Sequence, residues 1–351
     1  MIFSIFSKFE MAGGSEFRCV ELANGISKFT EHNSFLLAEK GMPSRLSSHI
    51  HSSVKVIENC LSFPENLYNS DCIIVINTDV REFSTLDYWT GKSSRHSTVL
   101  DINRLKNKKM FFLYNFLVSP SRHLYELFNE GIDVRILTTN HKFFNEITKQ
   151  DRYESIWSLP RDVLISPIDQ TQLNIFERNP KESICFGMHS KSLGNKWNDE
   201  ILRLITDINK RYDKSRVCFR FMGIKKELRK KIEKMDNVVC LDEDQELVKE
   251  FLSQIDIFLF FPEWKREEPW ARVIAEAMVS GCPVVALDRG GTCDQVLKHN
   301  NGFLCKKYND YYKHLVYLIE HPEKINILSK NSIRISQNFY TESVVKRLLE
   351  L

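Results

Sequence analysis

Short apolar runs alternate with amphipathic segments of helical length along most of this chain. The predicted strands are Ile2–Phe6, Ser34–Ala38, Cys72–Asn77, Lys109–Leu113, Asp133–Thr138, Val163–Ser166, Ser183–Gly187, Val217–Met222, Val238–Leu241, Ile257–Phe261 and Pro283–Leu287. Between them the predicted helices include Glu16–Phe29, Ser121–Glu130, Trp197–Arg211, Lys225–Met235, Glu246–Gln254 and Trp270–Ser280. Short buried strands that alternate with helices predict an α/β protein built on parallel, doubly wound sheets.

The alternation is interrupted by a polar, proline-bearing stretch at Ser166–Lys181, after which Ser183–Gly187 begins a new strand–loop–helix unit. A length of 351 residues suits two domains of ordinary size. We therefore predict a Rossmann-like domain over residues 1–170, a second over 171–335, and a C-terminal helix over 336–351 that packs back on the first domain. Two such domains would face each other across a cleft, with ligands at the carboxyl ends of the strands.

Composition excludes several classes of protein. Lys and Arg number 49 against 46 Asp and Glu, a net charge of +3, which argues against a dedicated nucleic-acid binder. The nine cysteines form no C-x-x-C pair and indicate a reducing compartment. No apolar run approaches the roughly 20 residues of a membrane-spanning helix. We expect a soluble, cytoplasmic protein.

The segment from Phe260 to Ala286 carries most of the chemistry. It predicts a strand, a loop, a helix with Pro269 in its first turn, a stop at Gly281, and a buried strand. Glu268 and Glu276 would lie roughly 12 Å apart along the helix axis. That separation suits one carboxylate at each end of a sugar–diphosphate–ribose ligand, with the helix N-terminus facing the diphosphate.

This segment resembles the donor motif of the large retaining GT-B glycosyltransferase family usually numbered four. Seven residues separate Glu268 from Glu276, and Ala277–Ala286 (A-M-V-S-G-C-P-V-V-A) follows. The resemblance implies a nucleoside diphosphate sugar as donor substrate, with Glu268 on the sugar hydroxyls and Glu276 on the ribose. It also implies transfer with retention, without a metal or a bound cofactor.

Three further motifs extend the resemblance in the family's order. Gly13-Gly14 resembles the N-terminal glycine turn that faces the donor phosphates. The stretch from Gly187 to Lys196 resembles a segment whose two basic side chains bind the diphosphate; Lys196 matches its lysine, and Lys191 is the candidate for its arginine. The last motif, which closes the donor domain, is represented by Gly290-Gly291 with Asp294 and by Asn301-Gly302.

The chain also departs from the family pattern. Trp270 and Ala271 stand where Phe-Gly is usual beside the sugar, and Asp294 replaces a glutamate. The acceptor-side histidine that often follows an early strand has no evident counterpart, because the strand at Lys109–Leu113 continues into Tyr114-Asn115. The contacts to the acceptor are therefore not predicted.

Two other features have competing interpretations. Asp242-Glu243-Asp244 matches a metal-binding D-x-D pattern, but its place before a predicted helix favours capping of that helix. The basic segment Arg104–Lys109, followed by the apolar Met110–Leu113, suggests peripheral contact with the inner face of the membrane, although a core strand is favoured for the apolar part. His189, in the donor loop, is interpreted as structural.

The resemblance implies a metal-independent, retaining glycosyltransferase. Its acceptor would be a hydroxyl of a growing surface glycan or of a lipid-linked saccharide. Two alternatives stay open: a sugar-nucleotide epimerase of the same fold, and a GT-B subunit that binds without catalysis. A Rossmann dehydrogenase is disfavoured because no G-x-G-x-x-G follows the early strand.

Overall fold

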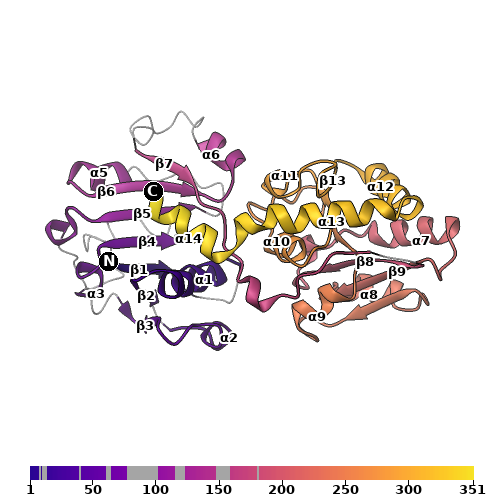
Figure 1. Cartoon of the computed structure of the whole chain (residues 1–351), viewed down its shortest axis with the longest axis horizontal. Coiled ribbons are helices and arrows are strands. Elements are labelled where there is room, and N and C mark those ends of the chain that lie inside the picture. Colours follow the sequence, from indigo (N-terminus) through magenta and orange to yellow (C-terminus); the bar gives the residue numbers. More distant parts are fainter. Residues whose placement is uncertain are drawn as a thin grey trace. The chain divides into compact units, whose positions relative to one another are not determined.

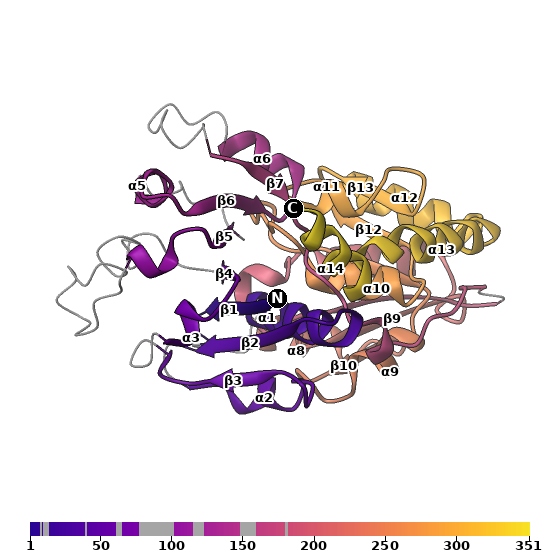
Figure 2. The same ribbon diagram turned by 60° about the vertical axis from the view of Figure 1, so that its left-hand side comes forward.

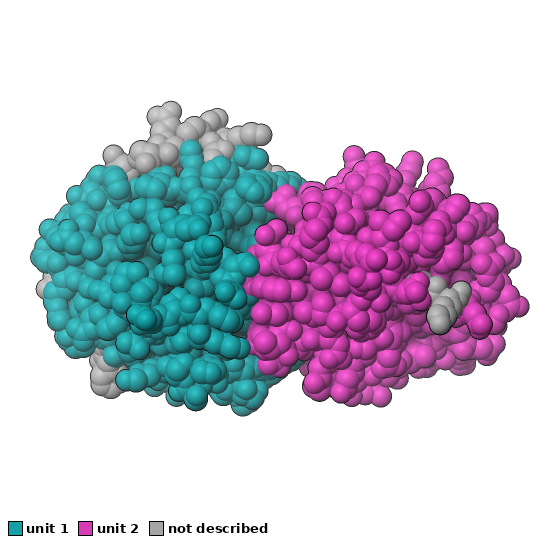
Figure 3. All heavy atoms as spheres, in the orientation of Figure 1, with its two compact units in different colours: residues 1–167, 341–351 teal, residues 168–340 magenta. Residues whose placement is uncertain are grey.

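The computed structural model describes residues 1–7, 9, 14–38, 41–60, 65–76, 102–114, 123–147, 159–179 and 182–351. The chain forms two compact units (Figure 3): unit 1 comprises 1–167 and 341–351, and unit 2 comprises 168–340. The sequence placed these boundaries after residues 170 and 335. Where the chain enters and leaves unit 2, the Ile168 amide donates to the Phe339 carbonyl at 2.7 Å, so the two connections lie side by side.

Unit 1 is built on a parallel sheet that, within the described residues, has seven strands in the order β3-β2-β1-β4-β5-β6-β7 (Figures 1 and 2). The strands are β1 (Ile2–Ser7), β2 (Asn33–Ala38), β3 (Lys55–Ile57), β4 (Cys72–Ile76), β5 (Lys109–Tyr114), β6 (Asp133–Thr138) and β7 (Arg161–Val163). The predicted strand at Val163–Ser166 is misplaced. Pairing with β6 covers 161–163, and the chain then leaves the sheet toward unit 2.

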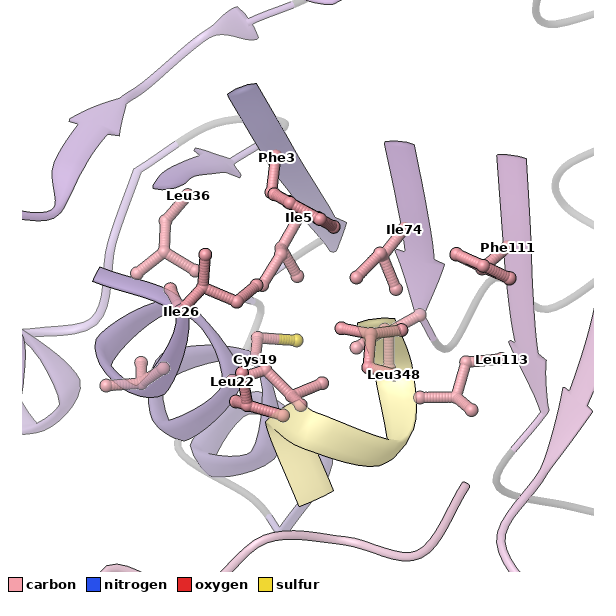
Figure 4. Close-up of a cluster of buried hydrophobic side chains, with 14 of the residues drawn as sticks. Phe3, Ile5, Cys19, Leu22, Ile26, Leu36, Ile74, Phe111, Leu113 and Leu348 are labelled. Carbon is pink, nitrogen blue, oxygen red and sulfur yellow. The ribbon is translucent and has the colours of Figure 1, made fainter. Parts of the chain in front are cut away.

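Helices cover the sheet of unit 1. They are α1 (Gly14–Phe29), α2 (Ser44–Ser47), α3 (Glu65–Tyr68), α5 (His123–Asn129), α6 (His141–Ile147) and α14 (Thr341–Glu350), with a 3₁₀ turn, η2, at Ile102–Leu105. Figure 4 shows the core between α1, α14 and the strands, where Leu348 of α14 lies among Cys19, Leu113 and other buried side chains. The C-terminal helix is thus part of the core of unit 1.

The basic segment before β5 is engaged within unit 1. Arg104 donates to both carboxylate oxygens of Glu65 at 2.6 and 2.7 Å, and Lys106 lies 4.0 Å from Glu130. Residues 110–113 are buried in β5, which confirms the interpretation of this stretch as a core strand. Within the described residues, no helix combines the length and hydropathy needed to cross a bilayer.

Unit 2 contains a second parallel sheet, of six strands in the order β10-β9-β8-β11-β12-β13. The strands are β8 (Ile184–His189), β9 (Val217–Met222), β10 (Val238–Leu241), β11 (Ile257–Phe260), β12 (Val284–Leu287) and β13 (Gly302–Cys305). The helices are α7 (Ile201–Arg211), α8 (Lys226–Ile232), α9 (Val248–Ser253), α10 (Arg272–Val279), α11 (Thr292–Gln295), α12 (Tyr308–Glu320) and α13 (Glu323–Ser336), with 3₁₀ turns η4 (Gln170–Gln172), η5 (Gly194–Lys196) and η6 (Gln337–Phe339).

The strand order of unit 2 reverses between β8 and β11. In doubly wound sheets, ligands bind outside the carboxyl ends of the strands at this switch point. The loops that follow β8 and β11 are therefore where the fold places a ligand. The two parallel sheets confirm the predicted α/β class.

Candidate functional site

The two loops at the switch point of unit 2 hold each other in place. The Asn198 amide donates to the Phe261 carbonyl and the Asn198 side chain donates to the Pro262 carbonyl, each at 3.1 Å. The Glu263 amide donates to the Asn195 carbonyl at 3.3 Å. The sequence separates these loops by more than sixty residues, but the pairing of β8 with β11 brings them together. The first loop carries Lys191 and Lys196, and the second carries Glu268.

Lys196 and Glu268 form a direct ion pair. Lys196 Nζ lies 2.8 Å from Glu268 Oε2, and the side chains are 20% and 16% exposed. Arg266, which sequence reasoning missed, donates through Nε to the same oxygen at 2.7 Å. Burial lowers the pKa of the Lys196 ammonium; Glu268 opposes this effect, while the charges of Arg266 and Lys191 add to it. The charge of Lys191 is therefore close enough to affect the pKa of Lys196. The Lys191 carbonyl accepts a hydrogen bond from Trp197 Nε1 at 3.0 Å.

The Gly290-Gly291 turn contacts the backbone of Glu268. The Gly291 amide donates to the Glu268 carbonyl at 2.8 Å. Gly290 has a φ of +67°, and a Cβ there would lie 2.5 Å from the same carbonyl oxygen. Only glycine can occupy position 290, because any side chain there would clash with the backbone of Glu268. The pair of glycines that resembled a family motif thus has a specific role here, which is to position the backbone of Glu268.

Glu276 lies in the middle of α10, where Arg272 donates to it and the imidazole of His189 lies nearby without a hydrogen bond from Nε2 in the described part of the chain. Arg272 Nε donates to Glu276 Oε1 at 2.8 Å, and His189 Nε2, at the end of β8, lies 3.5 Å from Oε2. His189 is 6% exposed and sits edge-on against Phe251 and Phe258. Burial, with help from the charge of Arg272, lowers the pKa of His189 to about 4. The imidazole is therefore neutral near pH 7.

Helix α10 starts later than predicted. It begins at Arg272, so the expectation that Pro269 occupies its first turn is wrong, and the axial estimate of the distance from Glu268 to Glu276 does not apply. The reason is Gln295, whose side chain accepts from the Ala271 amide at 3.1 Å and donates to the Ala271 carbonyl at 3.0 Å. These bonds hold Ala271 in an extended conformation at the N-cap.

The remaining predicted site residues have varied surroundings. Trp270 is 8% exposed, packs edge-on against Phe339, and its Nε1 is buried without a hydrogen-bond partner in the described part of the chain. Gly187 lies within β8, where a Cβ would meet the Ile255 side chain at 2.4 Å, so close packing explains this glycine. Gly14 is the first residue of α1, with open space around its α-carbon, and Gly13 lies outside the described residues.

The acidic triplet after β10 does not cap a helix, so that interpretation is wrong. Helix α9 begins only at Val248, and Leu247 at its N-cap makes no side-chain capping bond. Asp242 instead pairs with Arg229, and Glu243 accepts from the Ser192 amide at 2.9 Å. Across the described ranges, no group of three or more His, Cys, Asp or Glu side chains is arranged to hold a metal ion.

Comparison with known proteins shows which families and folds this chain resembles. Residues 175–334 match the family model of the glycosyl transferases group 1. Spore coat protein SA of Bacillus subtilis is 31% identical over 100 residues, which cover 27% of this chain and 26% of that protein. Trehalose synthase of Pyrococcus furiosus is 34% identical over 85 residues, covering 24% of this chain and 21% of that enzyme. These matches span about a quarter of the curated relatives or less.

Solved structures match over the whole chain. A glycosyltransferase from Rickettsia africae superposes with a TM-score of 0.75 at 12% identity, over 99% of this chain and 97% of the other. Anabaena HepE in complex with UDP-glucose superposes with a TM-score of 0.70 at 15% identity, over 100% and 98% of the two chains. The architecture is therefore that of the GT-B glycosyltransferases. The family model of the glycosyl transferases group 1 covers nearly all of unit 2, so unit 2 is the part of the chain that matches this family.

Proposed function

We propose that this protein transfers a glycosyl group from a nucleoside diphosphate sugar to a hydroxyl acceptor, with retention of configuration and without a metal. The observation that carries the proposal is the ion pair between Lys196 and Glu268 at the switch point of unit 2. A cation and a carboxylate held side by side at this edge suit a ligand with adjoining anionic and hydroxylated parts. A diphosphate joined to a sugar is such a ligand.

The four predicted charged residues each have a role in this proposal. Glu276 accepts hydrogen bonds from the ribose hydroxyls, and Glu268 accepts hydrogen bonds from hydroxyls of the sugar. All hydrogen bonds that the described residues make to the Glu268 carboxylate go to Oε2, which leaves Oε1 available to a ligand. Lys196 and Lys191 bind the diphosphate, together with the N-terminus of α10.

The chemistry requires one bond exchange. The bond from the anomeric carbon to the diphosphate oxygen breaks, and a bond to the acceptor oxygen forms on the same face of the sugar. The departing diphosphate takes the acceptor proton. Positive charge at Lys196 stabilises the diphosphate as its negative charge grows, so catalysis consists of positioning and electrostatic stabilisation.

We infer that the acceptor is a growing surface glycan or a lipid-linked saccharide. The match of residues 175–334 to the group 1 glycosyl transferases supports this class, and one matched relative is named for the spore coat. Peripheral contact with a membrane has no support from segment 104–109, because Arg104 and Lys106 pair with acidic side chains.

A donor panel tests the proposal. UDP-, GDP- and ADP-sugars, beginning with UDP-glucose, are compared by thermal shift for the native protein and for Glu276→Ala. The correct donor at 100 times its Kd raises the free energy of unfolding by about 2.7 kcal/mol, and the variant loses about half of this gain or more. Equal shifts in both proteins, or none for any donor, would reject the proposed site.

Product analysis then separates the alternatives. With donor and a panel of saccharide acceptors, NMR of the product should show a glycosidic bond of the same anomeric configuration as the donor. Release of an epimerised or free sugar without acceptor would indicate an epimerase. Donor binding without turnover over the whole acceptor panel would indicate a binding subunit.

A further inference from the structure

The cluster around Glu268 carries more positive than negative charge. Lys196 Nζ and Arg266 Nε contact Glu268 Oε2 at 2.8 and 2.7 Å. Among the described residues, Glu268 is the only carboxylate paired with either cation. The three side chains are 20%, 18% and 16% exposed, so water solvates them only in part. Within the described part of the chain, one of these two positive charges therefore has no partner anion in a largely buried position.

This imbalance is unfavourable in the free protein. Two cations that share one carboxylate oxygen repel each other, and partial burial strengthens that repulsion. The lowered pKa of Lys196 has burial as its main cause, with Arg266 and Lys191 as further causes. A second anion placed against Lys196 and Arg266 would remove the repulsion. The cluster is thus organised to receive negative charge.

The backbone of Arg266 is fixed, whereas its side chain depends on Glu268. The Arg266 amide donates to the Glu263 carbonyl at 2.9 Å, and Trp264 within the same turn donates through Nε1 to a carboxylate oxygen of Glu200 at 2.7 Å. The guanidinium presents its planar donors at the end of this anchored turn, a geometry that matches two oxygens of a phosphate group.

We propose that Arg266 is a further diphosphate-binding residue beside Lys196, and that Glu268 occupies their donors until the diphosphate arrives. The inference rests on the proposed function, because it takes the ligand to be a nucleoside diphosphate sugar. When the diphosphate binds, it replaces Glu268 as the partner of the two cations. The carboxylate is then available to the hydroxyls of the sugar.

A ligand series locates the effect of Arg266. Uridine, UMP, UDP and UDP-glucose are titrated by calorimetry against the native protein and Arg266→Gln, with the adenosine and guanosine series if the donor panel selects another base. Loss of one charge-assisted contact should weaken UDP binding about 10- to 100-fold while uridine changes less than about threefold. Lys265→Gln, at the exposed neighbouring position, is the matched control and should change neither.

Two further variants make the test decisive. Arg266→Lys keeps the charge and should recover part of the lost UDP affinity, while far-UV circular dichroism checks that each variant folds. Glu268→Gln removes the competing carboxylate, so UDP should bind more tightly than to the native protein, although UDP-glucose loses its contact to the sugar.

The ligand at which Arg266→Gln loses affinity decides whether the inference holds. If Arg266→Gln weakens only the step from UDP to UDP-glucose, Arg266 acts through Glu268 and the inference is overturned. An unchanged UDP affinity would overturn it as well. If the native protein binds no member of any series, the proposed function itself fails.

Discussion

The buried imidazole of His189 leads to a prediction about stability and pH. Its pKa in the folded protein is lowered from 6.5 to about 4, mainly by burial and then by the charge of Arg272. The groups that face it are Arg272 and Glu276 on α10, the rings of Phe251 and Phe258, and the charge of Asp244 after β10, which opposes the shift. A histidine whose pKa is lowered by folding stabilises the protein above its unfolded pKa, and this stability is lost as the pH falls.

The magnitude follows from the two pKa values. Fully developed, the difference between 6.5 and about 4 corresponds to roughly 3 kcal/mol of unfolding free energy. Between about pH 7 and about pH 4.5 the loss is about 2 kcal/mol, because most unfolded imidazoles gain a proton over this range and most folded ones do not. His189→Gln replaces the imidazole with a neutral group that does not titrate. Between the two pH values, the unfolding free energy of this variant should therefore fall by about 2 kcal/mol less than that of the native protein.

Urea denaturation at the two pH values measures this difference. Tryptophan fluorescence follows the unfolding of unit 2, which contains Trp197, Trp264 and Trp270, once Trp89 and Trp157 of residues 1–167 are replaced by Phe in every protein compared. The exposed His321 provides the control, since His321→Gln should retain the pH dependence of the native protein. Equal losses of stability in the native protein and His189→Gln would refute the reasoning and show that burial does not hold this imidazole neutral.

Three other predictions concern the donor. Glu276→Ala should weaken nucleotide binding about 10- to 100-fold in calorimetry, because hydrogen bonds to a charged acceptor are lost, and unchanged affinity would leave Glu276 with a structural role only. Lys196→Ala should lower kcat about 10²- to 10³-fold with a smaller change in KM, and Lys191→Ala should show a weaker version; steady-state kinetics in which neither falls tenfold would place the diphosphate elsewhere. Activity should persist in EDTA and in the double variant Asp242→Asn with Asp244→Asn, whereas strict dependence on added Mn²⁺ would contradict the metal-free mechanism.

The hydrophobic pattern located the interior strands well. The predicted strands Asp133–Thr138 and Val217–Met222 have the observed bounds, because continuous apolar or alternating runs distinguish strands inside parallel sheets. The bounds of Val238–Leu241 are also as predicted, although β10 is an edge strand. The pattern missed β3 at Lys55–Ile57, an edge strand of three residues without a buried side chain, and β13 at Gly302–Cys305, which opens on a glycine.

The candidate site was only partly readable from the sequence. Motif resemblance pointed to Lys196 and Glu268, but their contact joins residues 72 positions apart and depends on the order of the strands. Arg266 was missed because a single arginine in a charged loop has no distinguishing pattern. The late start of α10 depends on Gln295, whose amide competes for the backbone of Ala271, and such a tertiary contact leaves no local signal.

The division of unit 1 between the two ends of the chain has a consequence for biosynthesis. Residues 168–340 form unit 2 from one continuous segment, so all of its strands are available as soon as that segment has left the ribosome. Unit 1 cannot complete its fold until residues 341–351 have been synthesised. The buried side chains of Val344, Val345 and Leu348, which complete its core, are synthesised only after the whole of unit 2. Until then the apolar surface that α14 covers is exposed on the nascent chain, and the two units finish folding in the reverse of the order in which they begin.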